Sequence, residues 1–229
     1  MKPANIYTYA FLNTPTSDVY LNLPKGNVAQ VHLINGTSIS AIVEPEISSN
    51  SFQNDDEQTI QMVLAHDRVI RELFQQTTVL PLRFGTYFNS AANLLNHIES
   101  HTQEYQDKLD SIQGKEEYTL KLIPQSFKEA PKPSGGSGRN YFLAKKENYE
   151  NQKKFNNAQS EEKYSLLNSI TQIYQSSMIV EQHPEEVRLY ILVNRDEKVL
   201  LSEQFLTWQK ACPRWNLILG EPLPPYHLM

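Results

Sequence analysis

The chain has 229 residues, enough for one large domain or two ordinary ones, and its 39% hydrophobic and 21% charged residues are typical of a globular protein. No apolar run approaches the roughly 20 residues of a membrane helix, and the net charge of -5 disfavours a dedicated nucleic-acid binder. The single cysteine, Cys212, excludes an internal disulfide framework. Because the N-terminus shows no charged and then apolar leader, we expect an intracellular protein.

The first part of the chain predicts three strands. Residues 5–13, 28–34 and 37–43 are rich in β-branched and aromatic side chains. The dipeptide Asn35-Gly36 between the second and third strands is the strongest short signal for a hairpin. These two strands should therefore pair antiparallel, and Pro45 should end the third.

Two helices follow. Residues 56–75 carry apolar side chains mostly at three- and four-residue spacing, with acidic residues at the N-terminal end, where the helix dipole favours them. A second helix is predicted from Ser90 to Leu109, with Asn89 or Ser90 as its cap. Gly114 should end this part of the fold.

Between these helices, residues 79–88 (VLPLRFGTYF) predict a return to the sheet. Pro81 has no N–H group for a sheet ladder, so it belongs at the edge or the start of a strand. Gly85 indicates a bulge or a close approach of two backbones. The segment should therefore be one strand with an irregular edge.

Arg83 lies in the middle of this apolar run, where an unpaired charge is costly. One interpretation is an ion pair with Asp67 or Glu72 of the preceding helix, and this is the structural role we expect. The alternative is a bidentate contact with the carboxylate of a partner.

The second part of the chain has a different order of elements. A strand comes first, then a proline- and glycine-rich flexible loop over residues 125–140, then one or two long polar helices. Two strands, a short helix and a last strand follow, and the proline-rich end reads as an extended tail. The expected strands are 117–123, 177–182, 187–194 and 215–219, the expected helices 141–174 and 200–212, and the tail 220–229.

These elements predict an α+β protein of two domains. Residues 1–112 should form an N-terminal α+β domain, and residues 113–219 a C-terminal domain of the order strand, helix, strand, strand, helix, strand. This βαββαβ order is typical of a modified ferredoxin-like domain. Residues 220–229 would follow it as the extended tail, packed on its own domain or docked on a neighbour, two alternatives of equal weight.

The residues that carry chemistry predict no catalytic, cofactor or metal site. The sequence has no phosphate loop, no Gly-x-Ser-x-Gly and no His-Glu-x-x-His motif. Residues 135–138 could hold an anion before a helix, but a plain flexible loop is the favoured interpretation. His97 and His101 are four apart but lack an evident third ligand, so a solvated helix face is expected. We expect a structural hydrogen bond for His66 and core packing for Cys212.

Four ordered motifs resemble the gas vesicle protein F/L family, most closely the cyanobacterial type of its F member. They are residues 66–70 with 78–86 (HDRVI, TVLPLRFGT), 117–121 (EYTLK), 138–143 (GRNYFL) and 220–226 (GEPLPPY). The resemblance spans nearly the whole chain. The tail departs from the family pattern, because Glu221 is an extra residue and Leu223 and Leu228 stand where tryptophan and phenylalanine are usual. The extended, proline-rich character of the tail is kept.

The resemblance implies a minor, non-enzymatic component that helps to assemble gas vesicles, the gas-filled protein shells inside the cytoplasm of buoyant microbes. It implies the small hydrophobic major shell protein as a partner, other minor gas vesicle proteins as further partners, and neither nucleic acid nor membrane. The alternative is a ferredoxin-like enzyme or small-ligand-binding protein that uses a cleft between the two domains. The candidate partner-binding or signature residues are Pro81, Arg83, Phe84, Gly85, Tyr141, Trp215, Pro224, Pro225 and Tyr226.

Overall fold

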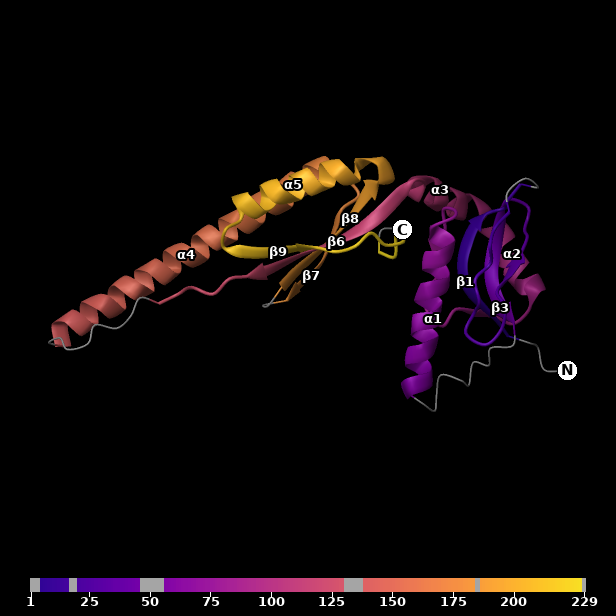
Figure 1. Cartoon of the computed structure of the whole chain (residues 1–229), viewed down its shortest axis with the longest axis horizontal. Coiled ribbons are helices and arrows are strands. Elements are labelled where there is room, and N and C mark those ends of the chain that lie inside the picture. Colours follow the sequence, from indigo (N-terminus) through magenta and orange to yellow (C-terminus); the bar gives the residue numbers. More distant parts are fainter. Residues whose placement is uncertain (1–4, 17–19, 46–55, 130–137, 184–185, 228–229) are drawn as a thin grey trace. The chain divides into compact units, whose positions relative to one another are not determined.

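The protein is an α+β fold in a computed structural model that describes residues 5–16, 20–45, 56–129, 138–183 and 186–227. The chain divides into two compact units (Figure 1). Unit 1 contains residues up to Glu117 together with residues 223–227, and unit 2 contains residues 118–222. The end of the chain therefore returns to the first unit.

Unit 1 is built on a sheet whose strands follow the order β2-β3-β1-β4, with β5 also paired to β1. Strand β1 pairs antiparallel with β3 along one edge and with the two short strands β4 and β5 along the other. The strands are β1 (Ile6–Asn13), β2 (His32–Ile34), β3 (Ile39–Pro45), β4 (Leu80–Pro81) and β5 (Tyr87–Phe88), and the helices α1 (Asp56–Phe74), α2 (Ala91–Ser100) and α3 (Thr102–Ile112).

Helices cover both faces of this sheet. Tyr7, Tyr9 and Leu12 of β1 pack with the buried face of α1, whereas Phe11 of β1 meets Tyr105 of α3 with ring centroids 4.8 Å apart. Because the side chains of a strand alternate between its two faces, a strand covered on both sides is apolar almost throughout, as β1 is.

The hairpin of β2 and β3 is confirmed, since His32 pairs with Val43 and Ile34 with Ala41 in antiparallel register. Strand β2 is shorter than expected because the chain before it turns around a carboxylate. The backbone N–H groups of Asn27, Val28 and Ala29 donate to Glu44, which lies fully buried. These N–H groups are thereby unavailable for a strand ladder.

The second helix of unit 1 is two helices. Ser90 caps α2 as expected, because its hydroxyl accepts a hydrogen bond from the N–H of Asn93 at 3.1 Å. The chain leaves the helical conformation at His101, where φ is -122° and ψ is 19°, and α3 begins at Thr102. The break lets both helices bury apolar side chains: Leu94 and Ile98 of α2, and Leu109 and Ile112 of α3.

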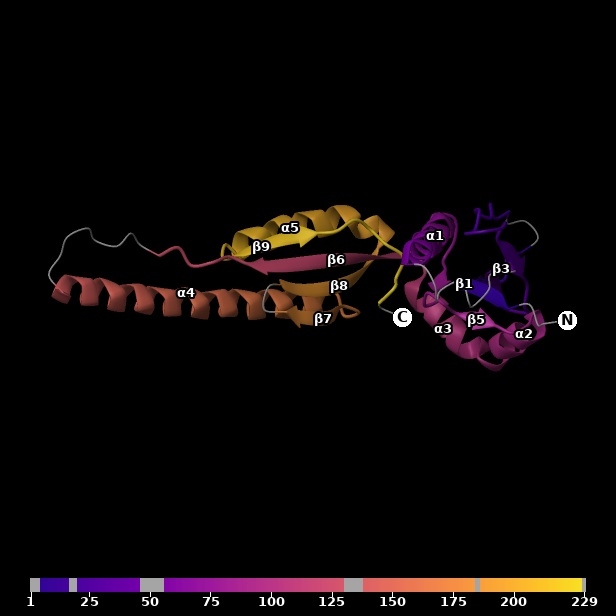
Figure 2. The same ribbon diagram turned by 90° about the horizontal axis from the view of Figure 1, so that it is seen from below.

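Unit 2 is a sheet of order β7-β8-β6-β9 with the two helices α4 and α5 on one face (Figures 1 and 2). The elements follow one another as strand, helix, strand, strand, a short 3₁₀ turn, helix, strand. They are β6 (Lys115–Pro124), α4 (Gly138–Ile173), β7 (Met178–His183), β8 (Glu186–Asn194), η2 (Arg195–Glu197), α5 (Lys198–Ala211) and β9 (Trp215–Leu219). Helix α4 is one continuous helix of 36 residues that includes residues 138–140 of the expected loop, and residues 130–137 of that loop lie outside the described residues.

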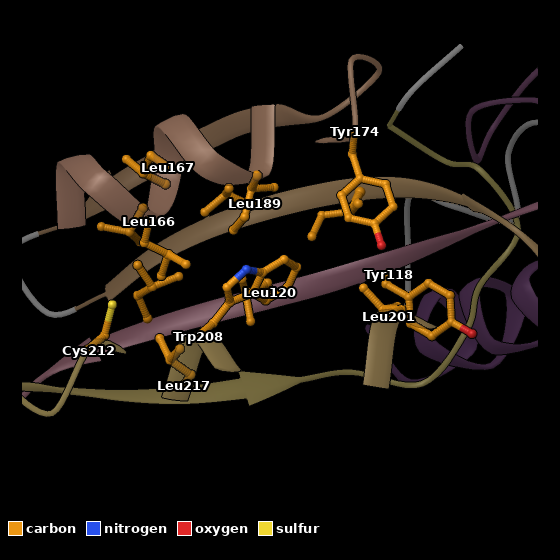
Figure 3. Close-up of a cluster of buried hydrophobic side chains, with 14 of the residues drawn as sticks. Tyr118, Leu120, Leu166, Leu167, Tyr174, Leu189, Leu201, Trp208, Cys212 and Leu217 are labelled. Carbon is orange, nitrogen blue, oxygen red and sulfur yellow. The ribbon is translucent and has the colours of Figure 1, made fainter. Parts of the chain in front are cut away.

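The core of unit 2 lies between the sheet and the two helices (Figure 3). Leu120 of β6 and Leu189 of β8 face Leu166 and Ile170 of α4, and Trp208 of α5 closes the layer. Cys212 is buried in this core, and burial raises the pKa of its thiol to about 11, so it packs as an apolar side chain.

Candidate functional site

The segment 79–88 is not one strand. Leu80 and Pro81 pair with β1, the chain turns out of the sheet between Leu82 and Thr86, and Tyr87 and Phe88 pair with an earlier stretch of β1. The turn is closed by Thr86, whose N–H and hydroxyl both donate to the carbonyl of Arg83, at 3.2 and 2.7 Å. Gly85 has a φ of +84° and no atom within 4 Å of the position of a Cβ. Glycine is needed here for its conformation and not for a close backbone approach.

The prediction that Arg83 forms an ion pair with Asp67 or Glu72 is wrong. Asp67 binds Arg71 at 2.6 Å and Glu72 binds Arg68 at 3.2 Å, both pairs spaced four residues apart along α1. Neighbours one turn away on a helix meet without ordering a distant loop, so they take both carboxylates. Arg83 is exposed, and its side chain makes no ion pair with the residues that the structure describes.

His66 of α1 fixes the turn from behind. Its Nε2 lies 3.0 Å from the carbonyl oxygen of Leu82, and its Nδ1 lies 2.7 Å from the hydroxyl of Tyr7. A carbonyl oxygen only accepts hydrogen bonds, so Nε2 carries the proton and Nδ1 of the neutral ring accepts from Tyr7. Burial lowers the pKa of His66 and so keeps the ring neutral. The structural hydrogen bond expected for this residue is present, and it holds the turn in place.

The tail closes the other side of the site within unit 1. Leu223 exchanges two backbone hydrogen bonds of 2.9 Å with Glu117. The carboxylate of Glu117 is fully buried and accepts from the N–H of His227 at 2.8 Å, and its other oxygen lies 2.7 Å from Nδ1 of the same residue. The hydroxyl of Tyr226 donates to Asp67 at 2.7 Å, and burial raises the pKa of that hydroxyl. Residues 223–227 therefore belong to the first unit and not to the unit that precedes them in the chain.

Strand β4 with the turn that follows it, helices α1 and α3, and the tail surround a groove of about 590 Å³. We call it the unit 1 groove. Its apolar lining comes from β4 and the turn, and its aromatic rim from α3 and the tail. Its charges are Arg83 of the turn and the ion pair of Lys108 with Glu104 on α3, at 2.9 Å. The lining residues are His66, Leu80, Pro81, Leu82, Arg83, Phe84, Glu104, Tyr105, Lys108, Tyr226 and His227.

The structure brings together most of the candidate residues of the sequence analysis. Pro81, Arg83, Phe84 and Tyr226 line the groove. Gly85 shapes its turn, and the buried Pro224 and Pro225 lead into Tyr226.

Two candidates lie elsewhere, in unit 2. Trp215 is half-buried and its indole N–H donates to the carbonyl of Gln159 at 2.9 Å, which is a packing role. Tyr141 lies in the first turn of α4 and is 49% exposed.

Sequence reasoning missed the contribution of α3. Tyr105 and Lys108 are three residues apart and so share a helix face, but no local signal shows that this face meets the turn at Arg83. Tyr105 also gives His97 a hydrogen-bond partner, because the Nε2 of His97 lies 2.7 Å from the hydroxyl of Tyr105. Among the described residues, no group of three or more His, Cys, Asp or Glu side chains could hold a metal ion.

An open groove with an apolar floor and a charged rim, on an α+β scaffold, is the kind of site that binds a partner. No helix of the described residues is both long and apolar enough to cross a membrane. The family model described as gas vesicle synthesis protein GvpL/GvpF matches residues 5–229, and the chain belongs to this family. It is therefore a gas vesicle protein.

Individual relatives agree with this membership. The chain is 27% identical over 122 residues to gas vesicle protein F1 of Halobacterium salinarum, a match that covers 52% of this chain and 54% of that protein. The chain thus spans about half the length of this curated relative.

Two solved structures show the same fold. The gas vesicle protein GvpF of Anabaena sp. PCC7120 superposes with a TM-score of 0.73 at 11% identity, over 98% of this chain and 95% of that one. GvpF of Microcystis aeruginosa gives 0.70 at 12% identity, over 98% of each chain.

Proposed function

We propose that this protein is a structural or assembly component of cytoplasmic gas vesicles that binds the small hydrophobic shell protein through the unit 1 groove. The observation that carries the proposal is the environment of Arg83. An exposed guanidinium with no described ion-pair partner stands on a turn that His66 holds rigid, beside an apolar lining. Such a groove fits an apolar segment that carries a carboxylate, because the floor takes apolar surface and arginine binds a carboxylate bidentately.

Preorganisation supports a binding role. The turn is closed by Thr86 and anchored by His66 and Tyr7, so little chain has to be ordered when a partner binds. An immobilised side chain costs about 0.5–1.5 kcal/mol in a complex. A site whose backbone is already fixed avoids most of that cost.

We also propose the finer description of the architecture. The two compact units support two domains, whose boundary lies within β6 or just before it. The order of the elements in unit 2 and the sheet order β7-β8-β6-β9 support a modified ferredoxin-like domain. The proline-rich segment 223–227 is an extended tail that completes the N-terminal domain.

The test is binding of the purified shell protein to the full chain and to Arg83 variants. We expect Arg83→Gln to weaken binding roughly ten- to hundredfold, since a hydrogen bond to a charged group contributes about 1.5–3 kcal/mol. Arg83→Lys should restore part of the affinity, because it keeps the charge without the planar fork. Lys210→Gln, an equal change of charge at an exposed site of α5, is the matched control.

Shell binding that is unaffected by Arg83→Gln would contradict the role of the groove, and no shell binding at all would contradict the function. Deletion of the tail is a poor test of binding, because it uncovers the buried carboxylate of Glu117 and weakens unit 1 itself. The alternative function, a ligand-binding protein or an enzyme, predicts a rise in melting temperature with a nucleotide, an acyl donor or a divalent metal. A flat response to all three, together with shell binding, favours the assembly role.

A further inference from the structure

Helix α4 is longer than the core that it packs on. Its C-terminal part supplies Leu166, Leu167 and Ile170 to the core of unit 2. At 1.5 Å per residue a helix of 36 residues is about 54 Å long, and its N-terminal half extends beyond the sheet in both views (Figures 1 and 2). We call residues 139–157 the arm.

The arm exposes large apolar side chains. Phe142 is 75% exposed and Tyr149 is 68% exposed. Scattered single apolar residues on a surface are ordinary, but large ones gathered on one projecting element indicate a contact surface.

Lysines share the face of these aromatic side chains. Phe142, Lys145, Lys146, Tyr149 and Lys153 are spaced by three, four, seven and eleven residues from the first, so they lie on one side of the helix. We call these five residues the arm face. All of them are exposed, and Glu147 lies on the opposite side. Lys146 forms an ion pair with Glu150 at 3.9 Å, and Glu150 also lies three residues before Lys153 on the helix.

A shallow groove of about 320 Å³ runs beside this face, between α4 and Glu129. Tyr141, Ala144 and Tyr149 line it. The arm therefore offers a partner an aromatic ridge, a row of cations and a recess of a size that takes an apolar side chain.

We propose that the arm face docks an acidic protein surface, namely an apolar helix or groove with glutamate or aspartate along its rim. The three lysines of the arm face are complementary to an acidic partner. They form a local basic surface on a chain whose net charge is -5. A second copy that used the same face would place lysine against lysine, which is repulsive. A membrane-surface helix needs a wide continuous apolar face, whereas here the lysines alternate with only two aromatic side chains. This surface is separate from the unit 1 groove and does not depend on the proposed shell binding.

The test is fluorescence anisotropy with the full chain and a labelled helical peptide of leucine, alanine and glutamate. The same peptide with lysine in place of glutamate is the control probe. We expect the acidic peptide to bind, the basic peptide not to bind, and added salt to weaken the complex, since exposed charges are screened. The double variant Lys145→Glu/Lys153→Glu should weaken binding by about tenfold or more, because it replaces two attractive contacts by repulsive ones.

Lys154→Glu/Lys210→Glu is the matched control, because it changes the net charge equally at exposed positions outside the arm face. It should leave the affinity within about twofold of the original. Lysine and glutamate have similar helix propensities, so both variants should stay folded, and circular dichroism checks this. Phe142→Ser/Tyr149→Ser should also weaken binding by about tenfold if the aromatic side chains are buried in the complex.

Three results would overturn the proposal: no binding of the acidic peptide, equal loss of affinity in the control variant, or tighter binding of phosphatidylserine vesicles or duplex DNA through the same lysines. The last result would assign the arm to a membrane or a nucleic acid. The outcome is distinguishable from the shell-binding test, because that test depends on Arg83 and leaves the arm unchanged.

Discussion

The two units bury different kinds of side chain. Unit 1 buries Glu44, His66 and Glu117. Among the described residues, no other acidic side chain and no other histidine is buried. The core of unit 2 is a cluster of aliphatic and aromatic side chains together with the Cys212 thiol. The first unit thus combines an apolar core with buried ionisable groups that fix its loops by hydrogen bonds, whereas the buried core of the second unit is apolar.

The difference matters for where a site can be built. Each buried group of unit 1 holds a segment that has little regular structure: Glu44 the turn at residues 26–29, His66 the turn at 82–86, and Glu117 the tail. Apolar packing is non-directional, whereas a hydrogen bond fixes a particular atom. Unit 1 can therefore hold an irregular groove in one shape, and unit 2 is suited to carry a rigid helix.

Truncation of the unit 2 core should have the largest effect. Trp208→Ala removes the side chain that closes the core over α5, and the expected loss is about 3–5 kcal/mol of unfolding free energy. Both tryptophans of the chain, Trp208 and Trp215, belong to unit 2. Urea denaturation followed by the remaining Trp215 therefore reports on unit 2 alone. An equal loss in amide-exchange protection of β1 would show that the two units unfold together.

Removal of a buried charge in unit 1 should have a smaller effect. Glu44→Gln keeps the shape of the side chain but weakens the hydrogen bonds from Tyr9 and from the backbone at 27–29. We expect a loss of about 1.5–3 kcal/mol, the contribution of a hydrogen bond to a charged group. Amide exchange of β1 and β3 measures it, and the tryptophan signal of unit 2 should not move. Leu33→Ala, a change at a partly buried apolar site of β2, provides a control for simple loss of packing.

The local elements of the fold could be read from the sequence. The Asn35-Gly36 hairpin, the Ser90 cap and the strand at 215–219 all depend on residues close in the chain, and each is found as expected. Turn chemistry and hydrophobic periodicity are local signals, so they survive in a single sequence.

The candidate site could be predicted only in part, because its contacts join distant residues. The pair of Glu117 and His227 is 110 residues apart, and that of Asp67 and Tyr226 is 159 residues apart. Nothing near Tyr226 indicates which carboxylate it meets. The prediction of an ion pair for Arg83 was wrong because of local contacts. Arginines of α1 itself bind the two carboxylates that Arg83 was expected to reach.

A drop in pH should give the smallest effect, and it should lower the stability of unit 1 before that of unit 2. Burial lowers the pKa of His66 below its ordinary value of about 6.5. Below that pH the unfolded chain binds a proton that the folded chain excludes, so the unfolding free energy of unit 1 falls as the pH drops from about 6.5 toward the lowered pKa, and it is full above about 6.5. A protonated ring would also present a second N–H to Tyr7, whose hydroxyl now donates to that nitrogen. We therefore expect amide exchange at residues 82–86 to speed up between pH 7 and pH 5 before the tryptophan signal of unit 2 changes.

His66→Gln keeps a donor and an acceptor without titrating, and it should flatten this part of the pH profile. A profile unchanged by His66→Gln would show that another group of unit 1 carries the acid sensitivity.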